Sequence, residues 1–398
     1  MSRELRPLLV PTAPREVLAM LPALRAALDG HGPALLPVTA ADRQRLVSAV
    51  GLVAPVPGHT ALVVGTSGST GAPKGVMLSA RALVASAVAT NDRLGGPGRW
   101  LMAMSARYIG GLQVLIRSLV VGTTPAVVDL TGGFRPMEFA KAARSVLSDD
   151  GPRYTALVPT QLSRLLSDGG AGLDALRGFD AVVLGGAAAP ETVLASAAAA
   201  GVRIVVSYGM SETAGGCVHD GVPLDGVRIR LSGAQPTGRI ELSGPVLTHG
   251  YLPDTGRPPV VDGWFATSDL GRWLPDGRLA VVGRIDDLIN TGGVKVSPLL
   301  VEQALTALAE VSSAAVVGIE DPEWGHRVAA AVVPADPAGP PDESALRAAV
   351  RDSVGDAAVP KEFRLVTELP LLGPGKVDRG AVRAIFARSD QVHRRHCE

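Results

Sequence analysis

Residues 63–79 read VVGTSGSTGAPKGVMLS, a segment that places four glycines, several hydroxyl side chains and one lysine between two apolar stretches. The apolar ends predict two short strands, and the glycine-rich middle predicts the loop that joins them. Consecutive backbone N–H groups, hydroxyls and one ammonium can surround a polyanion. The segment therefore predicts a cradle for a triphosphate. A flexible Gly/Ser/Thr linker is the alternative, but the strand-like residues flank the loop closely on both sides.

The loop does not fit the phosphate loop of nucleotide hydrolases. That motif requires glycine directly before the lysine, Ser or Thr directly after it, and a helix that starts there. In this chain Pro73 precedes Lys74, and Gly75 follows it. Pro73 also moves the preceding residue away from helical dihedral angles, and residues 76–78 read as a strand. The sequence therefore argues against that class of nucleotide-binding protein.

The segments around the loop predict an α/β architecture. Ser79 suits the N-cap of a helix over residues 80–94. Residues 179–186 predict a strand, 190–201 a helix and 202–209 a second strand, which together make a βαβ unit in a parallel sheet. Short strands and turns follow over residues 225–283 and predict an antiparallel β subdomain. After them, helical and strand-like segments alternate around the Pro/Gly-rich loop PADPAGPPDES.

Composition limits the function classes. The formal net charge of the 398 residues is zero, which argues against binding to nucleic acid or to an anionic membrane surface. Two cysteines, Cys217 and Cys397, cannot form a disulfide framework and suit a reducing cytoplasm. No long apolar run predicts a transmembrane helix, and charges and prolines interrupt the N-terminal segment where a signal peptide would need an apolar core. The expectation is a soluble cytoplasmic protein.

Six motifs, in order through residues 63–379, resemble those of the adenylate-forming superfamily, which includes acyl- and aryl-CoA synthetases. They are TSGSTGAPKGV, SYGMSETAGG, GRIELSGPVLTHGY, GWFATSDLGR, GRIDDLINTGGVKVSP and PLLGPGKVDR. The resemblance implies a large domain of stacked, mostly parallel α/β sheets plus a β subdomain, over residues 1–283, that binds ATP and the acyl group. A small mobile α+β domain, residues 284–398, is expected to carry the catalytic lysine. Only about 62 residues precede the phosphate loop, so the large domain is expected to have a trimmed N-terminus.

The resemblance implies a reaction with ATP, Mg²⁺ and CoA. A carboxylate and ATP give acyl-AMP and pyrophosphate, and a thiol then attacks the acyl-AMP. Both reactants of the first step are anions, so cations, N–H donors and magnesium are needed to align them. Glu212 is the expected magnesium ligand, and Asp269 and Arg284 are the expected ribose contacts. The residues expected to hold phosphates are Thr66, Ser67, Gly68, Ser69, Thr70, Gly71 and Lys74. Those expected near adenine are Gly185, Gly186, Ala187, Ser207, Tyr208, Gly209, Met210 and Ser211.

Lys376, in a glycine-rich segment near the C-terminus, matches the family lysine that bridges the substrate carboxylate and the nucleotide during adenylation. Thr66, Glu212 and Lys376 are therefore the expected catalytic residues. Asp286 occupies the position at which the small domain of the family rotates between half-reactions. Gly292, Gly293 and Lys295 resemble the stretch that lines the thiol tunnel.

Two strings, VLGGAAAP and YIGGLQVLIRSL, resemble members of the family that activate an aromatic keto-dicarboxylic acid. A buried arginine needs an anion, so Arg117 is a candidate partner for the second carboxylate, and Arg107, Tyr108 and Gly111 are further candidates for acyl contacts. A structural salt bridge is the alternative role for Arg117. Another aryl- or short-chain acyl-CoA ligase is the second choice, and an ATP-binding or ATP-hydrolysing protein without acyl transfer is the third. A homodimer is compatible with the sequence.

Overall fold

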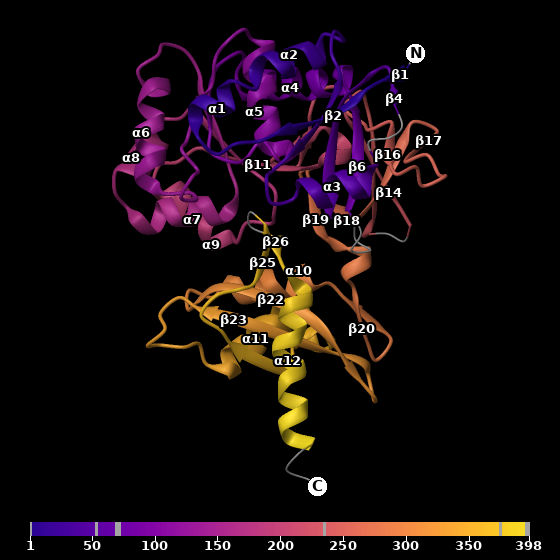
Figure 1. The fold of residues 1–398 in the computed structure, drawn as a ribbon. Coiled ribbons are helices and arrows are strands. Elements are labelled where there is room, and N and C mark those ends of the chain that lie inside the picture. The colour runs from indigo at the N-terminus through magenta and orange to yellow at the C-terminus, as the bar shows by residue number, and fades with distance from the viewer. Residues whose placement is uncertain (1, 52–54, 68–72, 234–235, 374–375, 395–398) are drawn as a thin grey trace. The chain divides into compact units, whose positions relative to one another are not determined.

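The computed structural model describes residues 2–51, 55–67, 73–233, 236–373 and 376–394, and it combines helices with mixed sheets (Figure 1). The chain divides into two compact units. Unit 1 contains residues 1–186, 196–230 and 241–267, and unit 2 contains residues 187–195, 231–240 and 268–398. A large N-terminal domain and a smaller C-terminal domain follow one another, as the sequence predicts. The sequence predicts a domain boundary between residues 283 and 284, where the small domain is expected to rotate. That boundary stays a prediction.

The largest sheet of unit 1 has seven strands in the order β13-β12-β11-β10-β9-β7-β8. The pairs among β7 to β11 are parallel, and β12 and β13 join antiparallel. The strands are β7 (Arg99–Met102), β8 (Ala126–Val127), β9 (Arg153–Leu157), β10 (Ala181–Leu184), β11 (Ile204–Met210), β12 (Gly215–His219) and β13 (Val222–Pro223). The predicted βαβ unit is present, because α9 (Glu191–Ala199) connects the parallel strands β10 and β11.

A second sheet of unit 1 carries the opening loop. Its order is β16-β6-β5-β3-β2, from β2 (Leu5–Leu9), β3 (Ala34–Val38), β5 (Thr60–Ser67), β6 (Pro73–Ser79) and β16 (Gly250–Leu252). The pairs β2–β3 and β3–β5 are parallel, whereas β5–β6 and β6–β16 are antiparallel. This sheet is therefore mixed and not mostly parallel, because the loop connects two adjacent strands as a hairpin. The short strands β1 (Ser2–Arg3) and β4 (Val56–Pro57) pair separately.

Helices of unit 1 cover these sheets with apolar residues. The helix predicted over residues 80–94 is α4, and the hydroxyl of Ser79 accepts a hydrogen bond from the N–H of Ala82, as an N-cap should. Gly95 ends α4 in a left-handed conformation. The helices α6, α7 and α8 gather beside the large sheet (Figure 1). Unit 1 contains α1 (Pro14–Leu18), α2 (Leu21–Leu28), α3 (Arg43–Val50), α4 (Ala80–Leu94), α5 (Ile109–Val120), α6 (Pro136–Leu147), α7 (Pro159–Asp168) and α8 (Ala171–Arg177).

The predicted β subdomain is a sheet in the order β14-β15-β18-β17, with β19 paired to β18. The pairs β17–β18 and β18–β19 are antiparallel. The strands are β14 (Arg228–Ser232), β15 (Gly238–Ser243), β17 (Val260–Val261), β18 (Trp264–Trp273) and β19 (Leu279–Arg284). The antiparallel arrangement agrees with the short turns that separate these segments in the sequence.

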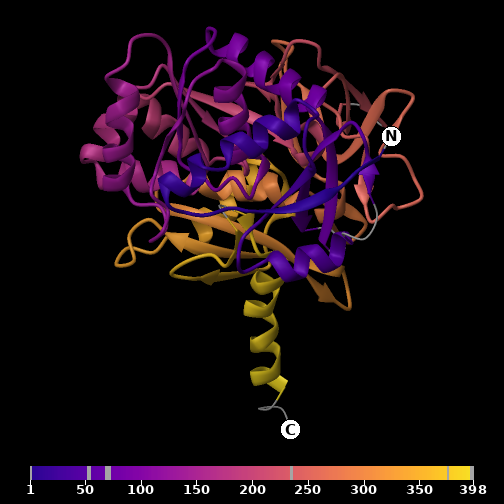
Figure 2. The same cartoon turned by 45° about the horizontal axis from the view of Figure 1, so that its top comes forward.

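The C-terminal part of unit 2 has a sheet in the order β21-β20-β23-β22, with β24 parallel to β23. Its helix α12 begins beside this sheet, and its far end projects away from unit 2 in both views (Figures 1 and 2). The elements are β20 (Ile289–Thr291), β21 (Val294–Val296), α10 (Pro298–Thr306), β22 (Val311–Asp321), β23 (Gly325–Pro334), α11 (Glu343–Ser353), β24 (Glu362–Leu365), β25 (Leu371–Gly373), β26 (Lys376–Val377) and α12 (Arg379–Arg394). Among the helices in the described ranges, none is long and apolar enough to cross a membrane.

A mostly buried ion pair ties α12 to α10. Arg379 donates to both oxygens of Glu302, at 2.6 and 3.1 Å, and also to the carbonyl of Val316 at 2.6 Å. The side chains of Arg379 and Glu302 are 23% and 14% exposed. Burial raises the pKa of Glu302 even though Arg379 acts to lower it. Breaking such a pair leaves one group charged and desolvated, which costs far more than the intact pair contributes.

We expect Glu302→Ala to lower the free energy of unfolding by about 3 kcal/mol, because Arg379 loses the carboxylate that accepts two of its hydrogen bonds and keeps the more distant Asp287, 3.7 Å away, while it stays largely buried. The double variant Glu302→Leu/Arg379→Met should recover most of that loss. Equilibrium urea unfolding measures both. The control is Asp356→Ala, which breaks a pair with Arg351 whose side chains are 51% and 87% exposed; it should change stability by less than about 0.5 kcal/mol. Equal losses in Glu302→Ala and in the control would contradict the expectation.

Candidate active site

The hairpin β5–β6 presents the start and the end of the opening loop. Its register pairs Thr66 with Lys74 and Ser67 with Pro73, and the hydroxyl of Thr66 lies 3.5 Å from the carbonyl oxygen of Lys74. Residues 76–78 are strand, so the exclusion of a hydrolase phosphate loop is confirmed. The predicted phosphate residues Gly68, Ser69, Thr70 and Gly71 lie outside the described residues.

Lys74 lies beside Glu212, although the two residues come from distant motifs. The Lys74 Nζ atom is 3.1 Å from Glu212 Oε1. Glu212 belongs to the short 3-10 turn η1 (Ser211–Thr213) between β11 and β12, and its backbone carbonyl accepts from the N–H of Thr248 at 2.8 Å. Thr248 also donates its hydroxyl to the carbonyl of Met77 in β6 at 2.7 Å. Thr248 therefore connects the turn that holds Glu212 to the hairpin that holds Lys74.

Tyr251 completes this group, and the sequence analysis did not single it out. Its hydroxyl donates to Glu212 Oε1 at 3.1 Å, and Lys74 Nζ lies 3.9 Å from the centroid of its ring. Burial, the charge of Glu212 and the hydrogen bond to it raise the pKa of Tyr251 above its ordinary value. The hydroxyl therefore stays a donor at neutral pH. Tyr251 closes the motif GRIELSGPVLTHGY, and that position was the signal that could have identified it.

The predicted adenine residues follow β10 or lie in the last part of β11 and just after it, near the carboxyl ends of parallel strands, where ligands of parallel sheets bind. Gly185 comes directly after β10, and a Cβ added to it would lie 3.2 Å from the carbonyl oxygen of Ser207. Gly186 has a φ of +86°, which favours glycine. Tyr208 is half-buried, and a register shift in the pairing with β12 lies between Tyr208 and Gly209. Met210 and Ser211 lead from the strand into η1, and Ala187 continues the chain after Gly186.

In unit 2, Asp269 and Arg284 lie opposite each other in the pair β18–β19. Arg284 Nη1 donates to Asp269 Oδ1 at 3.1 Å, and Arg284 Nη2 lies 3.5 Å from Asp286 Oδ2. The Asp269 side chain is 9% exposed and that of Arg284 is 47% exposed. Asp286 sits in the 3-10 turn η2 (Ile285–Asp287), which directly follows β19. The predicted ribose residues and the predicted pivot are therefore neighbours.

Gly292 and Gly293 form the turn between β20 and β21, with φ of +55° and +83°. A Cβ on Gly292 would lie 2.7 Å from the ring of Trp324, so the glycine lets this tryptophan pack on the turn. Lys295 is exposed in β21. The backbone of Lys376 pairs with Gly373 in the hairpin β25–β26, and its side chain lies outside what the structure describes.

The four predicted acyl residues have different surroundings. Arg107 forms a close ion pair with Asp42 and donates to the carbonyl of Gly65 at 3.0 Å. Burial raises the pKa of Asp42, but hydrogen bonds from Arg107 and Thr39 outweigh it and hold that pKa below its ordinary value. Arg107 thus already has a carboxylate. Tyr108 is 42% exposed, and Gly111 lets α5 approach the backbone of Ser105 closely.

Arg117 is 3% exposed, and no carboxylate pairs with it within the described ranges. Its guanidinium carbon lies 4.7 Å from the centroid of the Trp100 ring, and Nη2 is 3.5 Å from Thr90 Oγ1. Burial lowers the pKa of Arg117 to about 9, so the side chain is still a cation at neutral pH. The alternative of a structural salt bridge therefore gains no support from the part of the chain that the structure describes.

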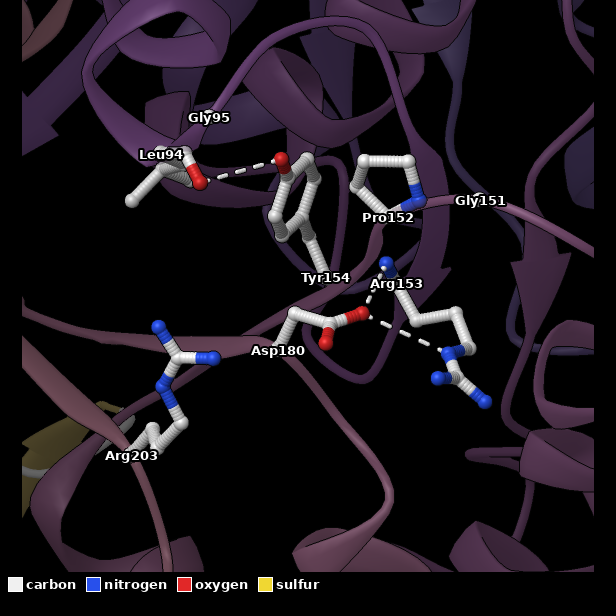
Figure 3. A pocket seen from close by; sticks show the side chains of 8 residues that line it. All are labelled: Leu94, Gly95, Gly151, Pro152, Arg153, Tyr154, Asp180 and Arg203. Carbon is white, nitrogen blue, oxygen red and sulfur yellow. Dashed lines mark hydrogen bonds and ion pairs between the residues drawn. The ribbon is translucent and has the colours of Figure 1, made fainter.

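A shallow pocket in unit 1 is lined by other residues (Figure 3). Arg153 begins β9, and Asp180 and Arg203 precede β10 and β11, so the pocket is at the amino ends of the parallel strands. Asp180 Oδ2 accepts hydrogen bonds from the backbone N–H and from Nε of Arg153, at 2.9 and 3.3 Å (Figure 3). The carboxylate of Asp180 and the guanidinium of Arg153 are therefore paired with each other. None of the predicted site residues lines this pocket, and it is not part of the candidate site.

Residues 21–252 match the family of AMP-binding enzymes, and residues 300–376 match the C-terminal domain of AMP-binding enzymes. A probable 2-succinylbenzoate–CoA ligase of Mycobacterium tuberculosis is 45% identical over 391 residues, which cover 97% of this chain and 100% of the relative. The amide bond synthetase McbA from Marinactinospora thermotolerans is a similar solved structure, with a TM-score of 0.81 and 25% identity over 97% of this chain and 90% of that one. An o-succinylbenzoate coenzyme A synthetase from Bacillus subtilis, solved in complex with AMP, has a TM-score of 0.68 and 26% identity over 81% of this chain and 68% of that one.

Proposed function

The chain belongs to the family of AMP-binding enzymes, and on that premise we propose that it is an ATP-dependent o-succinylbenzoate–CoA ligase. In the first half-reaction a carboxylate oxygen of the acid attacks the α-phosphorus of ATP, and pyrophosphate leaves. In the second, the thiol of CoA attacks the acyl carbonyl, and AMP leaves with the carboxylate oxygen. The product, o-succinylbenzoyl-CoA, is an intermediate of menaquinone biosynthesis. The strings VLGGAAAP and YIGGLQVLIRSL, and the relative that is 45% identical over nearly the whole chain, support this substrate.

One observation carries the nucleotide chemistry: Lys74 of the hairpin meets Glu212 at 3.1 Å. The hairpin and Lys74 supply N–H donors and positive charge for the β- and γ-phosphates. The carboxylate of Glu212 is a hard oxygen ligand and fits Mg²⁺, which keeps most of its other positions for water and phosphate. Bound there, the ion would neutralise phosphate charge during the attack. Tyr251 holds Glu212 in place through its hydroxyl.

The remaining roles follow from the positions that match the family motifs. Asp269 accepts hydrogen bonds from ribose hydroxyls, as an ionised carboxylate can accept several, and Arg284 makes a second ribose contact. The strand-end glycines 185, 186 and 209 leave room for adenine beside Tyr208. Lys376 aligns the acid with the nucleotide in the first half-reaction, and Asp286 is the pivot before the second. Gly292, Gly293 and Lys295 line the approach of the CoA thiol.

Arg117 is the proposed partner of the second carboxylate of o-succinylbenzoate, since a buried cation without a carboxylate supplies the charge that this group needs. Arg107 is the less favoured choice, because Asp42 already occupies it. A cytoplasmic location and a homodimeric state are further proposals. Fractionation of the source cells would check the first, and light scattering of the purified enzyme would check the second.

Pyrophosphate release over a panel of acids tests the proposal. We expect o-succinylbenzoate to give the highest kcat/KM, with benzoate, a fatty acid and benzoylpropionate far lower. If another acid gives the highest kcat/KM, the assigned substrate changes but the assigned reaction does not. The enzyme is then a different aryl- or short-chain acyl-CoA ligase. Release of phosphate without any acid would instead favour the ATP-hydrolysing alternative. Thioester formation from the preferred acid and CoA completes the test.

Tyr251→Phe should raise the Mg²⁺ concentration needed for half-maximal pyrophosphate release by about tenfold, because it removes the hydroxyl that orients Glu212 but keeps the ring beside Lys74. A Mg²⁺ titration at saturating ATP and acid measures this. The matched control is Tyr154→Phe, which removes a hydroxyl bonded to Leu94 and Gly96 in the pocket of Figure 3. If both variants have the Mg²⁺ requirement of the parent enzyme, the hydroxyl of Tyr251 does not position the ligand.

A further inference from the structure

Buried polar side chains gather where α4, α5 and β12 pack against one another. Arg117 of α5 is 3% exposed, and His219 of β12 is 1% exposed. In the described ranges, five buried polar atoms of these elements have no hydrogen-bond partner: Arg117 Nε, both ring nitrogens of His219, Nδ2 of Asn91 and Oε1 of Gln113. Buried polar groups of native proteins are nearly always satisfied. Five such atoms at one interface therefore indicate a polar ligand.

The cation of this cluster is held in position. Arg117 stacks on Trp100, whose Nε1 donates to Oδ1 of Asn91 at 3.2 Å. That bond fixes the amide of Asn91 and leaves its Nδ2 as a free donor. Among the residues that the structure describes, the guanidinium has one hydrogen bond to a side chain, the long one to Thr90 at 3.5 Å. Donors exceed acceptors here, so the missing ligand is an anion.

His219 adds a donor but no charge. Its burial, followed by the charges of Arg117 and Arg93, lowers the pKa of His219 to about 3. Arg93 itself is occupied, since it donates to the carbonyls of Val222 and Pro223. At neutral pH the imidazole is therefore neutral and donates through one nitrogen only. The cluster carries one positive charge, that of Arg117, and this matches a single carboxylate.

His219 lies next to the candidate nucleotide segment, because it pairs with Ser207 of β11 in the register of β11 and β12. A Cβ added to Gly216 would lie 3.2 Å from His219 Nε2 and would meet the hydroxyl of Ser207. Gly216 and Ser207 are both half-exposed. The absence of a side chain at residue 216 thus lets the Ser207 hydroxyl of β11 and the buried imidazole of His219 approach the same point. β12 also follows directly on the turn that holds Glu212.

Resting on the function proposed above, we propose that Arg117 and His219 form one buried subsite for the second carboxylate of the acid. Arg117 is its ion-pair partner, and neutral His219 donates a hydrogen bond to it. An acid with one carboxylate leaves Arg117 buried and unpaired, so the subsite selects against it. His219 is thereby a specificity-determining residue, which the sequence motifs did not indicate.

The test compares o-succinylbenzoate with benzoylpropionate, which lacks the second carboxylate. We expect His219→Phe, which keeps a ring but no donor, to raise the KM for o-succinylbenzoate by about tenfold to a hundredfold. Arg117→Gln should raise it by about a hundredfold or more. In both variants the ratio of kcat/KM for the two acids should fall. His219→Gln keeps an N–H donor and should retain most of the parent preference.

Ser118→Ala is the matched control, because Ser118 is buried and lies next to Arg117 in the sequence, but its hydroxyl donates to the carbonyl of Val114 in its own helix. It should keep the parent ratio. The KM for o-succinylbenzoate should also stay constant between about pH 6 and 8, since His219 remains neutral there. A KM that falls steeply as the pH drops through that range would show an ionised His219 and overturn the neutral-donor assignment.

A second measurement compares the two acids on the parent enzyme and uses a variant only to assign the signal. In the parent enzyme labelled with ¹⁵N-histidine, o-succinylbenzoate should shift the ring resonances of one histidine while they keep the pattern of a neutral imidazole, and benzoylpropionate should not. His219→Gln assigns that resonance. The subsite is overturned if o-succinylbenzoate leaves these resonances unmoved. It is also overturned if the variants lower kcat/KM equally for o-succinylbenzoate and benzoylpropionate. Those results would leave the proposed function standing, because the acid panel of the parent enzyme decides it separately.

Discussion

Lys376→Ala is expected to lower the rate of pyrophosphate release by about three orders of magnitude. In the first half-reaction a carboxylate must approach a phosphate, and both groups are anions. A positive charge that lies between them in the transition state offsets their repulsion. It does so more strongly in a protein site than in water, because the high dielectric constant of water weakens interactions between charges. The variant should still convert presynthesised acyl-AMP and CoA to the thioester at nearly the parent rate, because the second half-reaction needs no such cation. Separate assays of the two half-reactions measure the difference.

The control for Lys376→Ala is Lys141→Ala in α6. Lys141 is 71% exposed and lies 3.8 Å from Glu138, so its loss should change neither half-reaction by more than about twofold. Equal losses of both half-reactions in Lys376→Ala would contradict a role restricted to adenylation. A loss in adenylation as mild as that of the control would show that Lys376 is a solvated loop lysine.

Asp286→Pro is expected to abolish thioester formation while pyrophosphate release stays within about tenfold of the parent rate. Asp286 lies in the 3-10 turn η2, directly after the strand that ends in Arg284. Proline fixes φ near −65°, which is also the value of a 3-10 turn. The substitution therefore resists a change of φ at residue 286, although it also disfavours helical dihedral angles at Ile285, the residue before it. Stopped assays of acyl-AMP and thioester would show acyl-AMP accumulating.

Asp286→Ala separates the backbone effect from the loss of the carboxylate. It removes the 3.5 Å pair with Arg284, as the proline variant does, but it leaves φ free. We expect both half-reactions to survive in Asp286→Ala. If Asp286→Pro forms thioester at the parent rate, the pivot lies at another residue. If both variants lose thioester formation, the carboxylate is needed and backbone rotation is not the reason.

The sequence was most informative where neighbouring residues decide the structure. Pro73 before Lys74 and Gly75 after it excluded a helix at the end of the loop, and β6 is indeed a strand. Ser79 before an apolar repeat predicted the capped helix α4. Residues 179–209 predicted the βαβ unit that β10, α9 and β11 form. These features depend on dihedral preferences and on hydrogen bonds within a few residues, so the local sequence contains what determines them.

The strand directions of the second sheet could not be predicted from the local sequence. Its strands could be read from apolar runs, but their directions could not: the sheet is mixed, because β6 pairs antiparallel with β5 and β16. Strand direction depends on which strands become neighbours, and apolar composition is the same for both directions. The side-chain placements of the loop and of Lys376 stay predictions from the motifs.

The sequence by itself determined the order of the motifs, the chemistry of the residue types and the elements that carry them. Only the tertiary structure decided which side chains meet: Tyr251 with Glu212 and Lys74, Asp42 with Arg107, and His219 beside Arg117. Each of these groups joins residues from elements far apart in the chain. Their contacts depend on sheet register and on how helices pack over the sheet, and these are properties of the whole hydrophobic core. Burial then shifts the protonation of both groups: it lowers the pKa of Arg117 to about 9, still above neutral pH, and it is the largest cause that lowers the pKa of His219 to about 3, so that the imidazole is neutral.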